Sequence, residues 1–337
     1  MTATMPDEVM PFEHHQTAHC ESGVVSALLR ERGSPLSEAM VFGIASGLTF
    51  AYLPFVKLGG LPLISYRMPP RSILRGVGKR LGVTMRHETF KSPAEGMRAL
   101  DAHLAAGRVV GLQTSVYWLP YFPPDMRFHF NAHNLVVYGK RGDTYLISDP
   151  VFEQPVECDA ESLARARFVK GALAPNGLLY YPTAVPASFD LAPAIRKSIR
   201  FTTGMMLHTP VPLIGLRGIR LVARKIRHLD PAQQKHNKLF LGHVVRMQEE
   251  IGTGGAGFRF LYAAFLQEAS VVMQQPVLSE IAQQLTAAGD QWRQFALRCA
   301  RMCKDREPMD YAALSDMLLE AASLEQAVYQ RLRRDVR

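Results

Sequence analysis

Three residues that lie far apart in the sequence have the types that together make a nucleophilic site: Cys20, His133 and Asp149. Cys20 comes directly before a run of small and apolar residues, so we expect it at the N-terminus of a helix. There the N–H groups and the positive end of the helix dipole favour the thiolate, the form that attacks a carbonyl carbon. An isolated free cysteine is more often a buried core residue, so the case for Cys20 depends on a base and its orienting partner.

The residues around His133 and Asp149 predict a β-hairpin that would bring these two side chains together. Residues 133–138 and 144–148 have strand composition, and residues 140–143 form the turn. His133 opens the first strand and Asp149 follows the second, so both would lie at the same end of the ladder. The imidazole could then deprotonate Cys20 while the carboxylate fixes the imidazole tautomer. A cysteine helix followed by such a hairpin is the papain-like order.

The rest of the first half mixes helices and antiparallel strands, which indicates an α+β domain rather than a doubly wound sheet. A helix start with a capping serine and a proline stands at residues 34–38, and a Pro-rich loop follows at 120–124. The further elements that we expect are strands at 63–66, 83–88 and 109–118, a basic amphipathic segment at 71–81 and a helix over 94–104.

The second half is expected to be helical throughout. Residues 182–193 contain four prolines and are interpreted as a linker. We therefore predict a catalytic domain over residues 1–185 and a helical domain over 190–337. Six segments beyond the linker have apolar residues at spacings of three and four: 194–206, 215–229, 236–248, 258–274, 276–303 and 311–334.

Composition and charge limit the number of domains, the kind of partner and the compartment that we expect. The chain has 337 residues and 47% hydrophobic content, enough for two cores. Its formal charge of +9 favours an acidic partner. Four cysteines without framework spacing indicate a reducing compartment, and residues 1–13 lack the pattern of a secretory signal, so a cytoplasmic location is expected. The apolar segment 41–64 contains prolines, glycines and a lysine, which predicts buried core rather than a membrane span.

Several motifs across the chain resemble the butirosin-biosynthesis BtrH-like acyltransferases. In the first domain the resemblance lies in residues 19–20, 37–43, 46–50 and 117–121, together with His133 and Asp149. In the second domain it lies in Glu250-Ile251-Gly252-Thr253-Gly254-Gly255-Ala256-Gly257-Phe258-Arg259, followed by Tyr262 and by Phe265-Leu266. The resemblance therefore covers nearly the whole chain.

This resemblance implies a papain-like cysteine acyltransferase with a characteristic helical C-terminal domain. Carried over residue by residue, Cys20 is the nucleophile, His133 the base and Asp149 its orienter. The family implies an acyl group that arrives as a thioester on the phosphopantetheine arm of an acidic acyl carrier protein and leaves on an amine or hydroxyl acceptor. No bound cofactor, metal or nucleic acid is expected, while a peripheral membrane contact and a homo-oligomer are left open.

The groups that would stabilise the oxyanion do not follow the usual pattern. Papain-like enzymes place a glutamine six residues before the nucleophile, where this chain has His14, and Gln16 lies only four residues before it. The Cys20 backbone N–H is the first candidate, because helix N-termini direct donors at developing negative charge. The other candidates for substrate or oxyanion contacts are His14, Gln16, His19, Glu38, Tyr117, Tyr121, Gly254, Gly255, Arg259 and Tyr262.

Other interpretations compete for some of these residues. The cluster His14, His15, His19 and Cys20 could hold zinc, although it lacks a second group of ligands. Glu38 could be a second acid or simply a first-turn carboxylate. The glycines at 252–257 could cradle a phosphate, form a tight turn, or cap the active site with Arg259 and Tyr262. The basic residues at 196–200 and 217–227 could be solvated helix faces or could bind an acidic carrier or a membrane surface.

The sequence therefore favours an acyltransferase that works through a Cys20 acyl-enzyme. A hydrolase, either a thioesterase or a peptidase, could use the same three residues with water as the acceptor. A non-enzymatic carrier-binding or membrane-surface protein is the third hypothesis. The helical domain favours transfer, because an acyl-enzyme must be shielded from water while it admits its acceptor.

Overall fold

The structure is a computed structural model that describes residues 8–58 and 60–336. Residues 1–7 lie outside the described residues. The prediction that residues 1–13 lack a secretory signal falls partly on them. The chain forms two compact units. The first comprises the residues up to Val41 and 73–189, and the second comprises 42–72 and 190–337. Segment 42–72 thus groups with the C-terminal helices rather than with the 1–185 domain expected from the sequence.

An antiparallel sheet organises the first unit. Its strands run in the order β4 (Thr84–Glu88), β9 (Leu179–Ala184), β5 (Val110–Thr114), β6 (His133–Arg141), β7 (Thr144–Ser148) and β8 (Val156–Asp159), and β1 (Glu8–Val9) pairs with β6. The β6–β7 hairpin turns at Gly142, whose φ of 54° suits glycine. Val136 pairs with Ser148 across this hairpin, so His133 and Asp149 lie at the same end of the ladder, as expected.

The helices of the first unit begin and end at recognisable signals. They are α1 (Cys20–Glu31), α3 (Ser72–Leu81), α4 (Pro93–Ala105) and α5 (Ala160–Phe168), together with the short 3₁₀ helices η1 (Val116–Trp118) and η2 (Pro124–Met126). Helix α2 (Glu38–Ile44) crosses from the first unit into the second. The Ser92 side chain caps α4, and Pro93 occupies its first turn. Helix α1 packs against β6, which places the N-terminus of α1 beside the hairpin.

The core of the first unit lies on the central strands. Leu112, Leu135, Val137 and Ile147 are fully buried there. Each such side chain contributes about 1.5–3 kcal/mol through its removal from water. This core fixes the strands whose ends carry His133 and Asp149.

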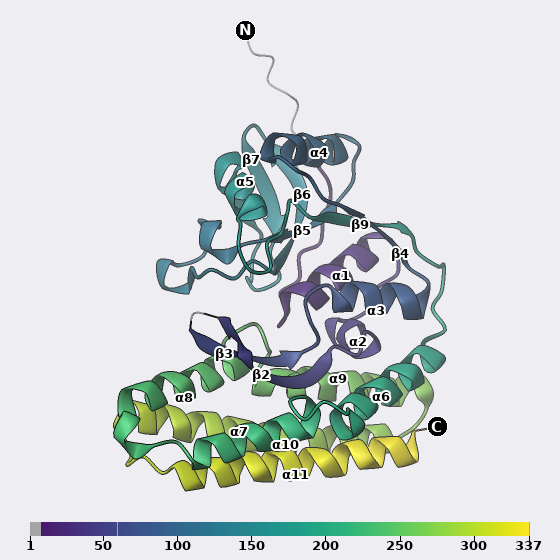
Figure 1. Cartoon of the computed structure of the whole chain (residues 1–337). Coiled ribbons are helices and arrows are strands. Elements are labelled where there is room, and N and C mark those ends of the chain that lie inside the picture. The colour runs from purple at the N-terminus through teal and green to yellow at the C-terminus, as the bar shows by residue number, and fades with distance from the viewer. Residues whose placement is uncertain (1–7, 59, 337) are drawn as a thin grey trace. The chain divides into compact units, whose positions relative to one another are not determined.

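The second unit combines six long helices with a β-hairpin. The helices are α6 (Leu191–His208), α7 (Gly215–Arg227), α8 (Gln234–Glu249), α9 (Arg259–Met273), α10 (Val277–Cys303) and α11 (Tyr311–Asp335), with η3 (Pro231–Gln233) and η4 (Ala256–Phe258) between them. The hairpin consists of β2 (Leu48–Leu58) and β3 (Leu61–Arg67) and packs against α7 and α8 (Figure 1). Phe50 and Tyr66 of this hairpin contact Trp292 of α10, which explains why segment 42–72 belongs to this unit.

All six helices predicted for the second half are present within a few residues of their expected bounds. Two of the expected boundaries differ from the structure. The strand predicted over 109–118 ends at Thr114, because 116–118 form η1. Residues 182–184 belong to β9 and not to the linker. Strands β1, β2 and β8, helix α5 and most of β9 were not predicted. Among the described residues, no helix combines the length and the apolar character needed to cross a membrane.

Candidate active site

Cys20 is the first residue of α1, as the sequence predicts. The backbone of His19 is extended and its ring accepts the Ser22 N–H, so His19 is the N-cap. The Cys20 side chain is 6% exposed. Its N–H lies in the first turn, where a helix offers no carbonyl acceptor of its own, and the dipole there favours negative charge. This position suits both a thiolate and the oxyanion that forms next to it.

His133 and Asp149 form a buried pair. The Nε2 atom of His133 lies 2.7 Å from Oδ2 of Asp149, and Asp149 is completely buried. His133 also forms a hydrogen bond with Cys20. Because Nε2 is bound to Asp149, a proton exchanged with the thiol would pass through Nδ1. The carboxylate, imidazole and thiol therefore form one hydrogen-bonded series of the kind that activates a nucleophile.

The charge state of His133 depends on these neighbours. Burial opposes the imidazolium, but the negative charge and the hydrogen bond of Asp149, together with Cys20, raise the pKa of His133 to about 10. The ring is therefore protonated at neutral pH. A protonated ring beside Cys20 favours the thiolate over the thiol.

Asp149 is held by further hydrogen bonds. The Tyr121 hydroxyl donates to Oδ2 at 2.8 Å, and the Val151 N–H donates to Oδ1 at 3.2 Å. Burial, then the Asp149 charge, hold the pKa of Tyr121 well above its ordinary value, so it remains a donor. The ring of Phe122 meets the His133 ring edge-on at 5.5 Å between centroids. Tyr121, a candidate for substrate contact, thus orients the carboxylate.

Glu38 fixes the chain just before the nucleophile. Its carboxylate accepts the N–H groups of Ala18 at 2.9 Å and His19 at 2.7 Å, and the Ser22 hydroxyl at 3.0 Å. Burial raises the pKa of Glu38, and these three hydrogen bonds oppose that rise. Of the two sequence interpretations, a second acid or a helix-end carboxylate, the contacts fit the second, with Glu38 joining the starts of α1 and α2. His19 is likewise committed to Ser22.

His14 and Gln16, considered as oxyanion donors, contact the segment that carries Asp149. The ring nitrogens of His14 lie 2.7 Å from the Ser148 hydroxyl and 3.0 Å from the Phe152 carbonyl oxygen. The exposed Gln16 amide donates to the Val151 carbonyl at 3.4 Å. Both side chains therefore support the end of β7 rather than the sulfur of Cys20.

Asn134 contacts Cys20 and was not among the predicted site residues. Its Nδ2 lies 3.9 Å from Cys20 Sγ and 3.0 Å from the Ala132 carbonyl oxygen. Its Oδ1 accepts the Tyr180 hydroxyl at 2.8 Å. The sequence does carry one signal for Asn134, since it is a polar residue next to the base in an otherwise apolar strand. Tyr180 lies in β9, which was not predicted, so its role could not be found.

Tyr117 is the most exposed aromatic candidate of the first unit. It is 40% exposed and stacks on His129, with 4.1 Å between the ring centroids. It follows Thr114, the residue that pairs with His133, by three positions. Tyr117 therefore stands near the end of the sheet that carries His133, where it is accessible from solvent.

The remaining candidates, Gly254, Gly255, Arg259 and Tyr262, belong to the second unit. Arg259 is completely buried, and its Nε and Nη2 atoms lie 2.8 and 3.1 Å from the two carboxylate oxygens of Glu325. Tyr262 is buried as well. We expected Arg259 and Tyr262 to meet a donor or acceptor, whereas the structure places both inside the helical core.

The glycine-rich loop at 252–257 makes its own internal hydrogen bonds. The Ala256 N–H donates to both carboxylate oxygens of Glu249 at 3.2 Å, and the Gly255 N–H donates to the Thr253 hydroxyl. A carboxylate of the protein thus accepts the N–H of Ala256 in this loop. The contacts favour the interpretation of this segment as an interhelical turn.

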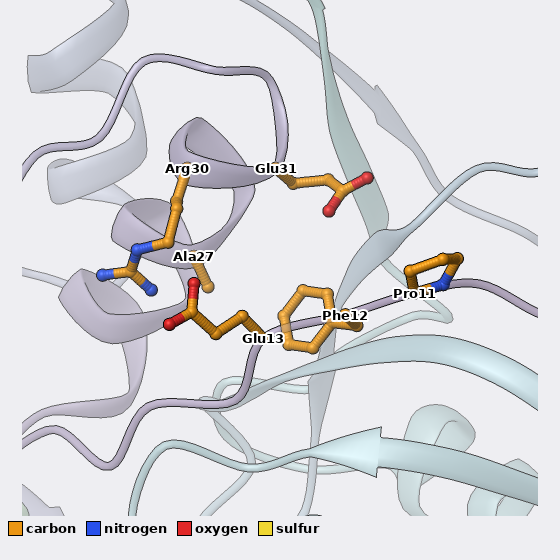
Figure 2. Close-up of a pocket in the computed structure, with 6 residues that line it drawn as sticks. All are labelled: Pro11, Phe12, Glu13, Ala27, Arg30 and Glu31. Atoms are coloured by element: carbon orange, nitrogen blue, oxygen red, sulfur yellow. The ribbon is translucent and has the colours of Figure 1, made fainter.

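The zinc hypothesis also lacks support in the described part of the chain, where no three His, Cys, Asp or Glu side chains group as metal ligands. A surface hollow is present at the other end of α1 from Cys20 (Figure 2). It is lined by Pro11, Phe12, Glu13, Ala27, Arg30 and Glu31. Figure 2 shows the charged groups of Glu13 and Arg30 on one side of it and that of Glu31 on the other. The residues of α1 that line this hollow lie about 10–17 Å along the helix from Cys20.

Two protein families match the chain. Residues 161–332 match the family described as a domain of unknown function (DUF4872), and residues 19–150 match the family described as butirosin biosynthesis protein H, N-terminal. No curated protein sequence matches significantly. Among solved structures, a Bacillus anthracis protein provisionally described as a C39-like peptidase is similar, with 15% identity and a TM-score of 0.36. The match covers 54% of this chain and 100% of that one.

Proposed function

Because the chain belongs to the DUF4872 family and carries a BtrH-like N-terminal domain, we propose that it is a cysteine-dependent acyltransferase of a biosynthetic pathway. It takes an acyl group from a carrier-protein thioester, holds it on Cys20 and passes it to an amine or hydroxyl. The observation that supports this proposal is the series Cys20, His133 and Asp149, with the cysteine at the N-terminus of α1.

The geometry suggests how the first half-reaction would run. The Cys20 thiolate attacks the thioester carbonyl carbon, and the negative charge on the carbonyl oxygen faces the N-terminus of α1. The bond between the carbonyl carbon and the donor sulfur then breaks. His133 gives its Nδ1 proton to the departing thiol, so the acyl group remains on Cys20 beside a neutral imidazole.

The second half-reaction reverses these roles. An amine or hydroxyl attacks the acyl carbonyl, and neutral His133 takes the proton that the acceptor loses. The bond between carbon and Cys20 Sγ breaks and returns the thiolate. Asp149 keeps the ring oriented throughout, because its carboxylate is held by Tyr121 and by the Val151 N–H.

The proposed donor is an acyl carrier protein with its phosphopantetheine arm. The formal charge of +9 favours an acidic partner, and an acidic acyl carrier protein would be such a partner. The matching N-terminal family is named after butirosin biosynthesis, which suits an enzyme that assembles a small molecule. The acceptor is proposed to be a small-molecule or lipid amine or hydroxyl.

Acylation of the nucleophile is the first test. We expect intact-protein mass spectrometry to show one added acyl group after incubation with acyl N-acetylcysteamine thioesters, which copy the end of the phosphopantetheine arm. The adduct should map to Cys20 and should be absent in Cys20→Ala, because only the thiolate carries the acyl group. Cys158→Ala is the matched control and should acylate normally, since burial raises the pKa of that thiol to about 12. An adduct on Cys158, Cys299 or Cys303 would overturn the assignment.

The fate of the acyl group separates transfer from hydrolysis. Preformed acyl-enzyme is divided between buffer alone and buffer with a panel of amines and alcohols, and the products are quantified. Transfer predicts that at least one acceptor gives an amide or ester faster than free acid appears. If free acid is the product whichever acceptor is offered, the site belongs to a hydrolase and the acyltransferase proposal fails.

A further inference from the structure

Resting on the proposed function, we propose that Asn134 is a further catalytic residue: its side-chain amide donates to the oxyanion that forms when Cys20 attacks an acyl carbonyl. The usual glutamine is missing from this chain, where His14 stands in its place. Asn134 would act together with the Cys20 N–H, so that one donor comes from β6 and the other from the start of α1.

The orientation of the Asn134 amide is determined by its neighbours. The Ala132 carbonyl can only accept, so the amide atom 3.0 Å from it must be the nitrogen. The oxygen then faces Tyr180, whose hydroxyl donates to it at 2.8 Å. One N–H of Asn134 is directed at Ala132, and the second remains for the side of Cys20.

The distance between Asn134 and Cys20 suits an oxyanion better than a thiolate. Nδ2 lies 3.9 Å from Sγ, which is long for a direct hydrogen bond. When Cys20 attacks, the oxyanion is joined to Sγ through the attacked carbon atom. An effective donor lies about 2.7–3.1 Å from that oxygen. That oxygen would lie beside the line from Nδ2 to Sγ and not on it, so a separation of 3.9 Å between these two atoms leaves the oxygen within reach of Nδ2.

The other polar groups proposed for this role have other partners. His14 contacts Ser148 and Phe152, and Gln16 donates to the Val151 carbonyl. Asn134 is 4% exposed, so its N–H works where little water competes. Its orientation is set before substrate arrives, which is the condition under which a donor accelerates the reaction.

The test compares two reactions of the same sulfur. Acylation by a thioester passes through an oxyanion, whereas alkylation by iodoacetamide is a displacement at carbon that forms none. Asn134→Ala should therefore lower the acylation rate constant about 10²–10³-fold. The alkylation rate at the same pH should remain within about threefold of wild type, because His133 still supports the thiolate. The control Asn131→Ala removes another buried asparagine, which donates to the Ala172 carbonyl, and should affect neither rate.

Two results would overturn the inference. One is an acylation rate that does not change in Asn134→Ala, and the other is an equal loss in acylation and alkylation, which would make Asn134 a support of the thiolate only. The acylation rate is also measured with p-nitrophenyl acetate, because the attack of Cys20 on this ester forms an oxyanion too. The inference thus stays testable even if no thioester or acceptor reacts and the proposed function fails.

Tyr180→Phe provides a milder variant in case Asn134→Ala unfolds. Loss of the hydroxyl leaves the amide oxygen without its 2.8 Å donor, so the amide should rotate more freely. We expect a partial loss of acylation with unchanged alkylation. Where Asn134→Ala folds, the double variant should be no slower than Asn134→Ala alone, since Tyr180 acts only through Asn134. Additive losses would contradict this relation.

Discussion

At the scale of single residues, the pairing of His133 with Asp149 determines how the site is charged. A buried imidazole beside a fully buried carboxylate holds its proton to high pH, and the positive charge of the ring favours the thiolate form of Cys20. The proposed acyl transfer would use this form, because a thiolate attacks a carbonyl carbon without a separate deprotonation step.

The charge of this pair predicts how the stability of the protein depends on pH. The pKa of His133 is about 10 in the folded state and about 6.5 in an unfolded chain. Since the folded value is raised, the stabilisation is complete below pH about 6.5 and is lost as the pH rises through about 10. Urea unfolding between pH 6 and 10.5 should show this decline. Asp149→Asn should flatten it, and an equally steep decline in that variant would contradict the role of the pair.

At the scale of elements, the starts of two helices are joined through one side chain. Glu38 opens α2, and its carboxylate accepts the backbone N–H groups of Ala18 and His19, immediately before α1. The Ser22 hydroxyl in the first turn of α1 donates to the same carboxylate. The position of the Cys20 N–H thus depends on a residue of another helix.

Glu38→Gln should weaken this junction. The amide has only one acceptor oxygen, so one of the two N–H groups would face an NH₂ group, at a cost of about 1–3 kcal/mol in the free energy of unfolding. Denaturant unfolding measures that loss, and Cys20 acylation should slow because the first turn of α1 is no longer fixed. Glu31→Gln, at the exposed end of the same helix, is the matched control and should change neither value. Equal stability of both variants would show that the junction contributes nothing.

At the scale of the whole molecule, the second unit has its own internal polar centre. Glu325 accepts hydrogen bonds from Arg259, from the Trp292 indole at 2.5 Å and from the Tyr329 hydroxyl at 3.2 Å. The Arg259 guanidinium also lies over the rings of Tyr66 and Trp292, at 5.5 and 5.0 Å from their centroids. Residues from the hairpin and from three helices therefore meet around one buried ion pair.

Arg259→Ala should accordingly act on stability rather than on substrate choice. It leaves the Glu325 carboxylate buried without its cation, which typically costs about 3–5 kcal/mol. Thermal unfolding should show the loss, whereas alkylation of Cys20 in folded protein should keep the wild-type rate. Arg293→Ala removes an exposed arginine near Glu249 and should cost under about 1 kcal/mol. If the Arg259→Ala protein instead keeps its stability and hydrolyses more of its acyl-enzyme, Arg259 would contact the substrate, as the sequence predicted.

The local features of this protein were accessible from the sequence. Helix periodicity predicted all six helices of the second half, because apolar spacing along one helix does not depend on its partners. The position of Cys20 at a helix start and the hairpin with His133 and Asp149 followed from short-range signals as well. The motifs also indicated a resemblance to the BtrH family, and residues 19–150 match the N-terminal model of that family.

The tertiary structure decided what depends on residues far apart in the chain. Segment 42–72 has strand-forming and apolar residues, but only its packing on α7 and Trp292 assigns it to the second unit. Arg259 follows a glycine-rich loop, which from the sequence predicted a substrate contact, yet Glu325 holds it in the core. Asn134 faces Cys20 because Tyr180, in a strand formed later in the chain, fixes its amide. Such contacts arise from chain closure over long loops, which no local pattern of side chains encodes.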